Sequence, residues 1–225
     1  DTEGPTQIET LVNQELVLTT DDVHSALSDL GDEHWKSALP RLLEDFQQLL
    51  RDALDILSEL DEADDHRDRS YWDLPSISAH WQNRGFRDWV SLIELLRDAW
   101  LAVHANDRVR ATRIAKSWFD LPYPTFKRLA LFAASQDACI SPEQWVDWLL
   151  TDDARWLWAT DSRREMFRLL VLQGGLLSGA AQIRLEAAIL VGPPREMYRD
   201  DLEADRWQRI LTQSVWLRLA KLETS

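Results

Sequence analysis

The residues of this chain that could do chemistry are carboxylates, histidines and arginines. The densest acidic run extends from Asp61 to Asp68 and includes His66, and such oxygen and nitrogen groups could bind a divalent cation. A calcium loop of the EF-hand type needs a glycine at its sharp turn, and this run contains no glycine. We therefore interpret the charged segment 61–70 as a solvated linker and predict no metal-binding residue.

Motifs that would supply a nucleophile, a base or a phosphate cradle are absent from the sequence. The histidines are His24, His34, His66, His80 and His104. They form no HExxH pair, which is the spacing of many zinc enzymes. No GxSxG, GxGxxG or phosphate-loop segment occurs either. We therefore predict no catalytic residue, no cofactor and no enzymatic activity.

Tryptophan and arginine concentrate in one short stretch, which contains Arg155, Trp156, Trp158, Arg163 and Arg164. These two residue types dominate the energetics of protein interfaces. Trp156 and Trp158 are two positions apart, so on a helix they point to different sides, and we expect one to be partly exposed. We predict that these five residues bind a partner, which is a protein or another domain of the same polypeptide. A structural role at a corner between helices is the alternative.

A group of basic residues could bind nucleic-acid phosphates. Its members are Arg108, Arg110, Arg113, Lys116, Lys127 and Arg128. However, acidic residues interleave with this group, no glycine-rich loop accompanies it, and the net charge of the chain is −14. Because a negative net charge repels phosphates, we do not expect a nucleic-acid partner.

Composition places the chain in the all-α class. Of its 225 residues, 45% are hydrophobic and only 7 are glycine, whereas all-β folds need many turns and many β-branched residues. The single cysteine, Cys139, cannot form an intramolecular disulfide, which favours a reducing, cytoplasmic setting. No apolar run approaches the roughly 18 residues that cross a bilayer, so we expect no membrane association. The first residue is Asp, which favours a fragment of a larger protein.

Charge divides the chain at residue 65. Residues 1–65 contain 18 acidic and 3 basic residues, whereas residues 66–225 contain 21 acidic and 22 basic residues. The second part also holds nearly all of the 12 tryptophans. We predict an acidic N-terminal helical segment over 1–65 and a Trp-rich helical-repeat domain over 66–225.

Apolar residues recur at helical spacing along most of the chain. Short helices are predicted over Ile8–Leu16 and Thr20–Leu30, and a long one over Leu39–Leu60. A further helix over Phe86–His104 places four large residues inward, namely Trp89, Ile93, Leu96 and Trp100. Most tryptophans have this kind of spacing, so we expect them to pack between helices.

Part of the sequence repeats itself. Phe126–Leu131 matches Phe167–Leu172 at an offset of 41 residues, and two-helix repeats of the HEAT type have periods of about 40–47 residues. Each such pair buries its apolar face against its neighbours. We therefore predict stacked helix pairs in an α-solenoid-like (HEAT-like) fold, with Leu129 and Leu170 at equivalent buried positions.

Four segments carry a resemblance to known proteins, and they are Phe126–Phe132, Trp156–Trp158, Arg163–Leu170 and Gly192–Tyr198. They resemble repeats in the helical regions of large bacterial antiviral-defence proteins, in which such a region accompanies a sirtuin-like or NTPase effector module. The resemblance covers residues 110–200. It implies a scaffold or sensor region. Since neither the NTPase loops nor a sirtuin active site occurs here, effector chemistry would lie outside this chain.

These observations together predict a non-catalytic helical scaffold or sensor region that mediates protein–protein interaction. The alternative is an all-α enzyme or small-ligand binder with a site between the two helical halves. A deep pocket that collects ionisable groups would favour the alternative, whereas a shallow groove would favour the scaffold. The sequence leaves the oligomeric state open.

Overall fold

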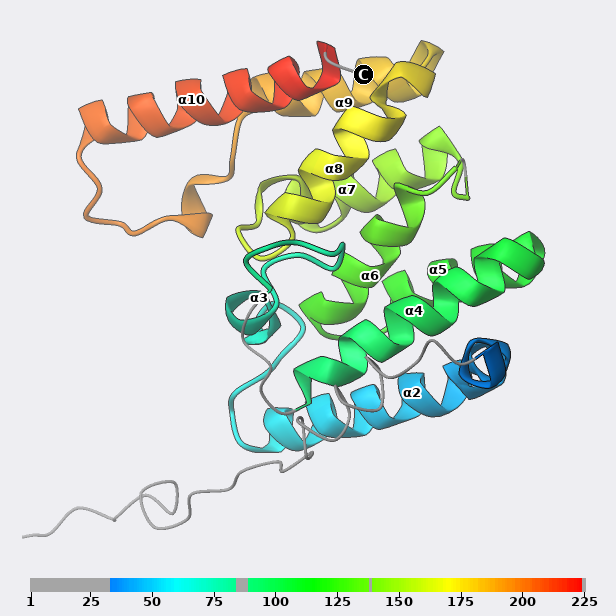
Figure 1. Cartoon of the computed structure of the whole chain (residues 1–225). Helices are drawn as coiled ribbons and strands as arrows, with labels where there is room; N and C mark the ends of the chain where they lie inside the picture. The colour runs from blue at the N-terminus through cyan, green and yellow to red at the C-terminus, as the bar shows by residue number, and fades with distance from the viewer. Residues whose placement is uncertain (1–32, 84–88, 138, 224–225) are drawn as a thin grey trace, which may run out of the picture.

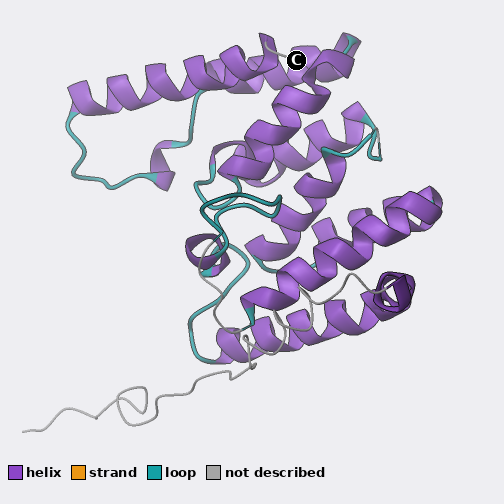
Figure 2. Cartoon of the chain, viewed as in Figure 1, coloured by secondary structure: helices purple, strands orange, loops and turns teal. Residues whose placement is uncertain are grey.

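The computed structural model describes residues 33–83, 89–137 and 139–223, and within these ranges it is helical with no strand (Figures 1 and 2). The α-helices of the described ranges are α2 (Glu33–Glu59), α3 (Ser70–Asp73), α4 (Val90–Asn106), α5 (Arg108–Asp120), α6 (Pro124–Ala134), α7 (Pro142–Trp158), α8 (Arg163–Gln173), α9 (Gly179–Val191) and α10 (Ala204–Glu223). Two short 3-10 helices are η2 (Gly174–Leu176) and η3 (Arg195–Met197). The all-α prediction is confirmed. The helices predicted over Ile8–Leu16 and Thr20–Leu30 lie outside the described residues.

The helices follow one another along the molecule, from α2 at the lower end of Figure 1 to α9 and α10 at the upper end. α2 packs against α4, α4 against α5, and α5 against α6. Further along, α6 lies against α8, α7 against α8 and α9, and α10 against α8 and α9. α2 precedes the predicted boundary at residue 65, and its Leu43, Leu50 and Leu54 belong to the same core as the helices that follow.

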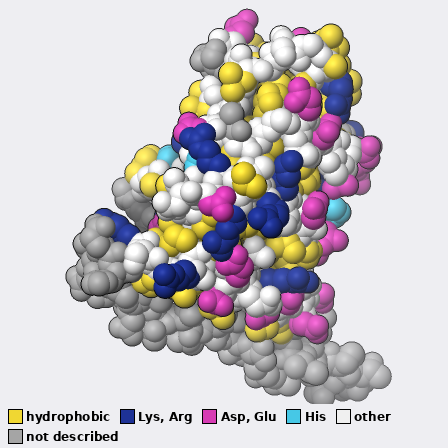
Figure 3. All heavy atoms as spheres, turned by 90° about the vertical axis from the view of Figure 1, so that its right-hand side faces the viewer, with side chains coloured by type: hydrophobic (Ala, Val, Ile, Leu, Met, Phe, Trp, Pro, Cys, Tyr) yellow, Lys and Arg dark blue, Asp and Glu magenta, His cyan; other side chains and the backbone are white. Residues whose placement is uncertain are grey.

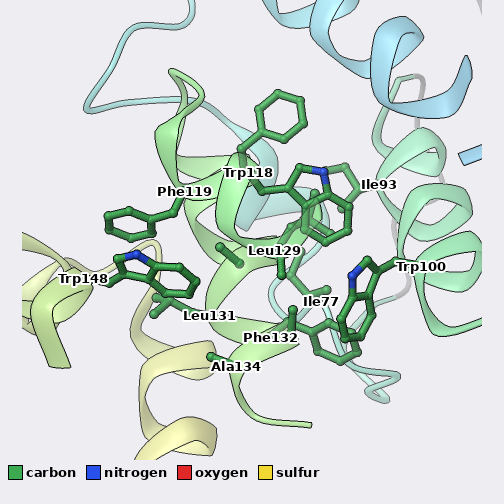
Figure 4. Packing of buried hydrophobic residues seen from close by; sticks show 14 of the residues in the cluster. Ile77, Ile93, Trp100, Trp118, Phe119, Leu129, Leu131, Phe132, Ala134 and Trp148 are labelled. Atoms are coloured by element: carbon green, nitrogen blue, oxygen red, sulfur yellow. The ribbon is translucent and has the colours of Figure 1, made fainter. Parts of the chain in front are cut away.

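Tryptophan rings are among the largest side chains buried in this core. The largest fully buried side chains include Trp100, Trp118, Trp145 and Trp156. In Figure 4, Trp100 and Trp118 lie side by side, with tilted rings whose centroids are 6.1 Å apart. The Trp100 indole N–H donates to the carbonyl oxygen of Ala111 at 3.0 Å, so this ring is both packed and hydrogen-bonded, as a buried indole should be.

The inward side predicted for the helix Phe86–His104 is confirmed over residues 89–104, whereas residues 86–88 lie outside the described residues. Trp89, Ile93, Leu96 and Trp100 are all buried, and α4 begins directly after Trp89. The apolar residues at three- and four-residue steps therefore form the side of α4 that packs on its neighbours.

Local sequence also accounts for several helix ends. The Asp107 side chain caps α5 by accepting from the backbone N–H of Arg110 at 2.9 Å. Pro124 opens α6, where a missing N–H costs nothing. Gly192 ends α9 with a φ of 87°, and a Cβ at this position would overlap the side chain of Leu211. The positive φ therefore favours glycine there, and a residue with a Cβ would also have to displace the Leu211 side chain.

α7 contains a left-handed turn in its second half. Asp152, Asp153 and Ala154 have φ values of 52°, 55° and 61°, although residues with a Cβ rarely adopt this region. The turn separates the first part of α7 from its last residues, Arg155–Trp158. It changes the direction in which the side chains of those last residues point.

Candidate functional site

A strap of non-helical chain with one short helix, residues 68–83, is fastened to α6 and α8. Asp68 is 1% exposed, and one of its carboxylate oxygens accepts from both the backbone N–H and the hydroxyl of Thr125 at 2.7 Å. The other oxygen accepts from the backbone N–H of Ser70 at 3.0 Å. The solvated-linker interpretation of 61–70 is therefore wrong at its C-terminal end. The reason is that Asp68 accepts from an N–H of the first turn of α6, for which the helix itself offers no carbonyl.

The side chains of Arg128 and Glu165 form hydrogen bonds with the rest of the strap. Their side chains are 0% and 1% exposed and form an ion pair of 3.4 Å. Arg128 also donates to the carbonyl oxygen of Leu74 at 2.6 Å and to the Ser70 hydroxyl at 3.0 Å. Glu165 accepts from the backbone N–H of Ile77 at 2.7 Å. Because every charge here is paired and hydrogen-bonded, this buried network can be maintained.

The strap forms one wall of an open cleft with a volume of about 550 Å³, and residues 160–164, in the loop before α8 and its first turn, form the other. We call it the aromatic–arginine cleft, and its lining residues are Tyr71, Trp72, Pro75, Trp81, Gln82, Thr160, Asp161, Arg163 and Arg164. Trp72 and Trp81 are 71% and 66% exposed, which is unusual for rings of this size. The ring of Tyr71 lies 4.9 Å from that of Trp72. The strap thus presents a row of aromatic rings to solvent.

Two arginines from the first turn of α8 form the opposite wall. Arg164 donates to the side chain of Gln82 and lies 3.2 Å from a ring nitrogen of His80, so it is oriented by the strap. Arg163 is exposed, with its guanidinium 5.3 Å from the centroid of the Phe167 ring. Within the part of the chain that the structure describes, neither arginine forms an ion pair with a carboxylate. Their positive charge is available to a ligand.

The carboxyl group of Asp161 belongs to the same wall of the cleft. Asp161 is half-buried, and its carboxylate accepts from the backbone N–H of Ser162 at 2.9 Å. Burial raises the pKa of Asp161, and the nearby charge of Asp68 raises it further. Burial and the charge of Asp161 also raise the pKa of the Tyr71 hydroxyl. The cleft therefore combines two cations with an acid that is more readily protonated than usual.

Of the five predicted partner-binding residues, only Arg163 and Arg164 line the cleft. Trp156 and Trp158 are 1% and 5% exposed, so the expectation that one of them would protrude is wrong. The side-chain directions expected of a regular helix do not apply, because the left-handed turn at 152–154 precedes them. Both rings consequently face the core.

The two buried tryptophans have separate partners. The ring of Trp156 packs edge-on against Phe119, with centroids 6.4 Å apart, and Trp158 lies under the guanidinium of Arg218. The fifth predicted residue, Arg155, is half-buried and donates to the carbonyl oxygen of His66 at 2.7 Å. These three residues therefore have the structural role that was the alternative.

The predicted basic group does not form one basic surface. Arg128 is buried under the strap, and Lys127 donates to the carbonyl oxygens of Phe119 and Leu121. Arg110 pairs with Glu44 at 2.6 Å. On the face shown in Figure 3, Lys and Arg side chains alternate with Asp and Glu. Over the described ranges, no group of three or more His, Cys, Asp or Glu side chains is arranged to hold a metal ion.

Sequence reasoning missed Trp72, Trp81 and Asp161 as site residues. One signal was present: Trp72, Pro75 and Trp81 lie in a stretch without long helical periodicity, so no extended helix face was available to bury the rings. Nothing in the sequence indicated that these strap residues lie next to Thr160–Arg164, because the two walls of the cleft are more than seventy residues apart in the chain.

A larger depression of about 690 Å³ lies along α10, but its lining residues come from this one helix. The aromatic–arginine cleft is instead formed by two separate segments, which is the usual construction of a binding site.

None of the helices in the described ranges has the length and apolar character that spanning a bilayer requires. Comparison of the chain with protein-family models, with curated proteins and with solved structures finds no match.

Proposed function

We propose that this chain is a helical scaffold that binds a protein partner through the aromatic–arginine cleft. The observation that carries the proposal is that one open cleft holds two exposed indole rings and two arginines that pair with no carboxylate among the described residues. Trp, Tyr and Arg are the residue types that dominate binding energy at protein interfaces. A rigid support for them also matters, and here the Arg128–Glu165 network provides it.

The charge of the cleft selects an acidic partner. Arg163 and Arg164 offer guanidinium groups that pair with carboxylates in a two-pronged geometry. On the facing wall, Trp72 and Trp81 of the strap provide flat apolar surfaces for an aromatic or aliphatic side chain of the partner. We therefore propose as ligand an exposed acidic segment that also carries a large apolar residue.

The packing of the C-terminal helices supports the repeat architecture that we propose for this scaffold. α6, α8 and α10 contact one another in succession, and α7 contacts α9 in the same way, as expected for helix pairs stacked with a common sense. Leu129 on α6 and Leu170 on α8 are both fully buried, which agrees with equivalent positions in two repeats.

The resemblance to bacterial antiviral-defence proteins fits this proposal. In that setting the chain would act as the sensor or scaffold region, and an effector module elsewhere in the larger protein would supply the chemistry. The cleft would then report the presence of the acidic partner.

A fluorescence-polarisation titration tests the proposed function. The probe is a fluorescein-labelled peptide of alternating glutamate and phenylalanine, compared with a lysine–phenylalanine peptide of equal length. We expect the acidic peptide alone to bind, and Trp72→Ala or Arg164→Glu to weaken it by about 30-fold, which is the effect of losing a hot-spot residue. The matched control is Trp216→Ala, because Trp216 is also 63% exposed but lies on α10. Equal binding of both peptides, or an equal loss in the control, would reject the proposal.

Asp161 favours a second candidate, the binding of a small ligand. A carboxyl group with a raised pKa beside cationic groups is typical of many active and ligand-binding sites. The open form of the cleft argues for a protein instead, since small-molecule sites bury most of their ligand. Asp161→Asn separates the two: peptide affinity should change little, whereas a small-ligand site would lose its titrating group.

A further inference from the structure

α9 has an apolar stripe on the side that faces away from the core. Its buried side consists of Ala181, Leu185 and Ile189. On the opposite side lie five exposed residues, namely Ala180, Ile183, Ala187, Leu190 and Val191. Ile183, Leu190 and Val191 are 68%, 66% and 81% exposed. We call these five residues the α9 stripe.

The α9 stripe is continuous along the helix. At 3.6 residues per turn, its five residues fall within an arc of about 100°, and the 13-residue helix is about 20 Å long. No polar residue falls inside that arc. The outer side of a surface helix is normally polar, and a helix that is apolar on two sides is normally covered on both. This pattern indicates a helix–helix interface whose second helix is not part of the described fold.

The residue sizes along the stripe favour a second copy of α9. Ala180, Ile183, Ala187 and Leu190 follow the three- and four-residue steps of a paired-helix seam. In an antiparallel pair centred at the level of residue 185, Ala180 lies opposite Leu190, and Ile183 lies opposite Ala187. Each large side chain then meets a small one from the other copy. In a parallel pair, large residues would meet large ones and alanines would meet alanines.

Charge at the edge of the stripe agrees with the same arrangement. Arg184 borders the stripe and forms an ion pair of 2.5 Å with Asp147 of α7. A two-fold axis perpendicular to antiparallel helices brings the same edge of each copy together. Arg184 of one copy therefore lies beside Asp147 of the other. On the opposite edge, Glu186 accepts from Gln182 at 2.8 Å.

We propose that the chain self-associates through the α9 stripe, as an antiparallel two-fold pair of α9 helices. α9 lies at the upper end of the helix stack in Figure 1, where it packs against α7 and α10. One short helix per copy buries less than the area of a standard interface, so the association is expected in the micromolar range. The proposal is independent of the aromatic–arginine cleft.

Analytical ultracentrifugation of the full chain tests the interface. Over about 5 to 300 µM, a range that brackets a weak interface, we expect a reversible monomer–dimer equilibrium. Leu190→Glu should weaken dimerisation at least about 10-fold, because it places a charge in the seam. The matched control is Val109→Glu, since Val109 is 77% exposed on α5, and it should leave the equilibrium unchanged. A chain that is monomeric throughout the range, or a dimer that persists in folded Leu190→Glu, would overturn the proposal.

A mixing experiment tests the antiparallel arrangement. The edge of the α9 stripe that carries Arg184 and Asp147 becomes wholly negative in Arg184→Glu and wholly positive in Asp147→Lys. Because two copies of the same variant then repel each other at this edge, each variant alone should dimerise less than the parent chain. Mixed in equal amounts, they should regain association as a heterodimer, because each edge then meets its opposite charge. If the mixture associates no more than the separate variants, the antiparallel pairing is wrong. Unchanged melting temperatures confirm that each variant is folded.

Discussion

The guanidinium of Arg218 on α10 lies 3.9 Å from the centroid of the Trp158 ring at the end of α7. Arg218 is 4% exposed, and its Nε donates to the carbonyl oxygen of Leu157 at 2.8 Å. Burial lowers its pKa to about 10, so the group remains a cation at neutral pH. A desolvated cation over an indole ring is a strong contact, and here it joins the last helix to the rest of the stack.

Arg218→Ala should therefore detach α10. The change removes the cation–ring contact and leaves the Leu157 carbonyl without its donor, at a cost of about 2–4 kcal/mol. Chemical denaturation monitored by tryptophan fluorescence gives the loss, and hydrogen exchange locates it in α10. The control is Arg209→Ala, because Arg209 is exposed on the same helix. Equal stability of the two variants would show that the contact does not hold α10.

Glu165→Ala should destabilise the fold more than an ordinary surface change. It leaves the 0%-exposed Arg128 without its anion, and breaking a buried ion pair from one side costs about 3–5 kcal/mol. Glu165→Gln keeps an acceptor for the backbone N–H of Ile77 and should cost less. Hydrogen exchange over residues 70–83 should speed up in both variants, since this network fastens the strap.

Two outcomes would contradict this account of the strap. One is a Glu165→Ala variant whose unfolding free energy is unchanged. The other is a destabilised variant in which exchange of the strap amides is no faster than that of α4. Glu186→Ala serves as the control. Within the described residues, the only hydrogen bond of the Glu186 side chain is the one that it accepts from Gln182 on the same helix, α9.

Asp153→Gly should stabilise the protein. Asp153 has a φ of 55°, where a residue with a Cβ carries strain on the order of 1 kcal/mol and glycine carries none. We expect a net gain of up to about 0.6 kcal/mol after the greater freedom of glycine in the unfolded chain, about 0.4–1 kcal/mol, is subtracted. Arg113→Gly, in the right-handed interior of α5, should instead lose about 1 kcal/mol. A loss at Asp153 would mean that the left-handed turn is not adopted.

His104 should make stability depend on pH. Its ring stacks on Trp100 with centroids 5.0 Å apart. Burial lowers the pKa of His104 and the charge of Arg108 lowers it further, whereas Asp137 opposes them. Because the folded pKa lies below the unfolded value, the unfolded chain binds more protons between the two. The stability is therefore present above the ordinary histidine pKa of about 6.5 and is lost as the pH falls.

Urea denaturation from pH 8 to pH 5 measures this effect. The slope of unfolding free energy against pH should decrease in His104→Gln relative to the parent chain. His66→Gln, at an exposed histidine, should keep the parent slope. A parent slope that survives in His104→Gln would assign the pH dependence to other groups.

The local sequence determined the helices and much of the core. The three- and four-residue apolar spacing predicts the inward side of α4. Asp107 and Pro124 account for two helix starts, and Gly192 accounts for a helix end. These features depend on neighbours within one or two turns, so they can be read from the chain directly. The α9 stripe also follows from spacing, but its exposure does not.

Only the tertiary structure decided which charges and rings are buried. Arg128 belongs to a basic run in the sequence, yet it is buried because Glu165 and the strap, 37 and 54 or more residues away, satisfy its donors. Trp158 looked like an interface residue, but the left-handed turn of α7 and Arg218 enclose it. Trp72 lines the cleft only because the strap lies beside the start of α8. Such outcomes depend on contacts between distant segments, and the periodicity of a single segment contains no information about them.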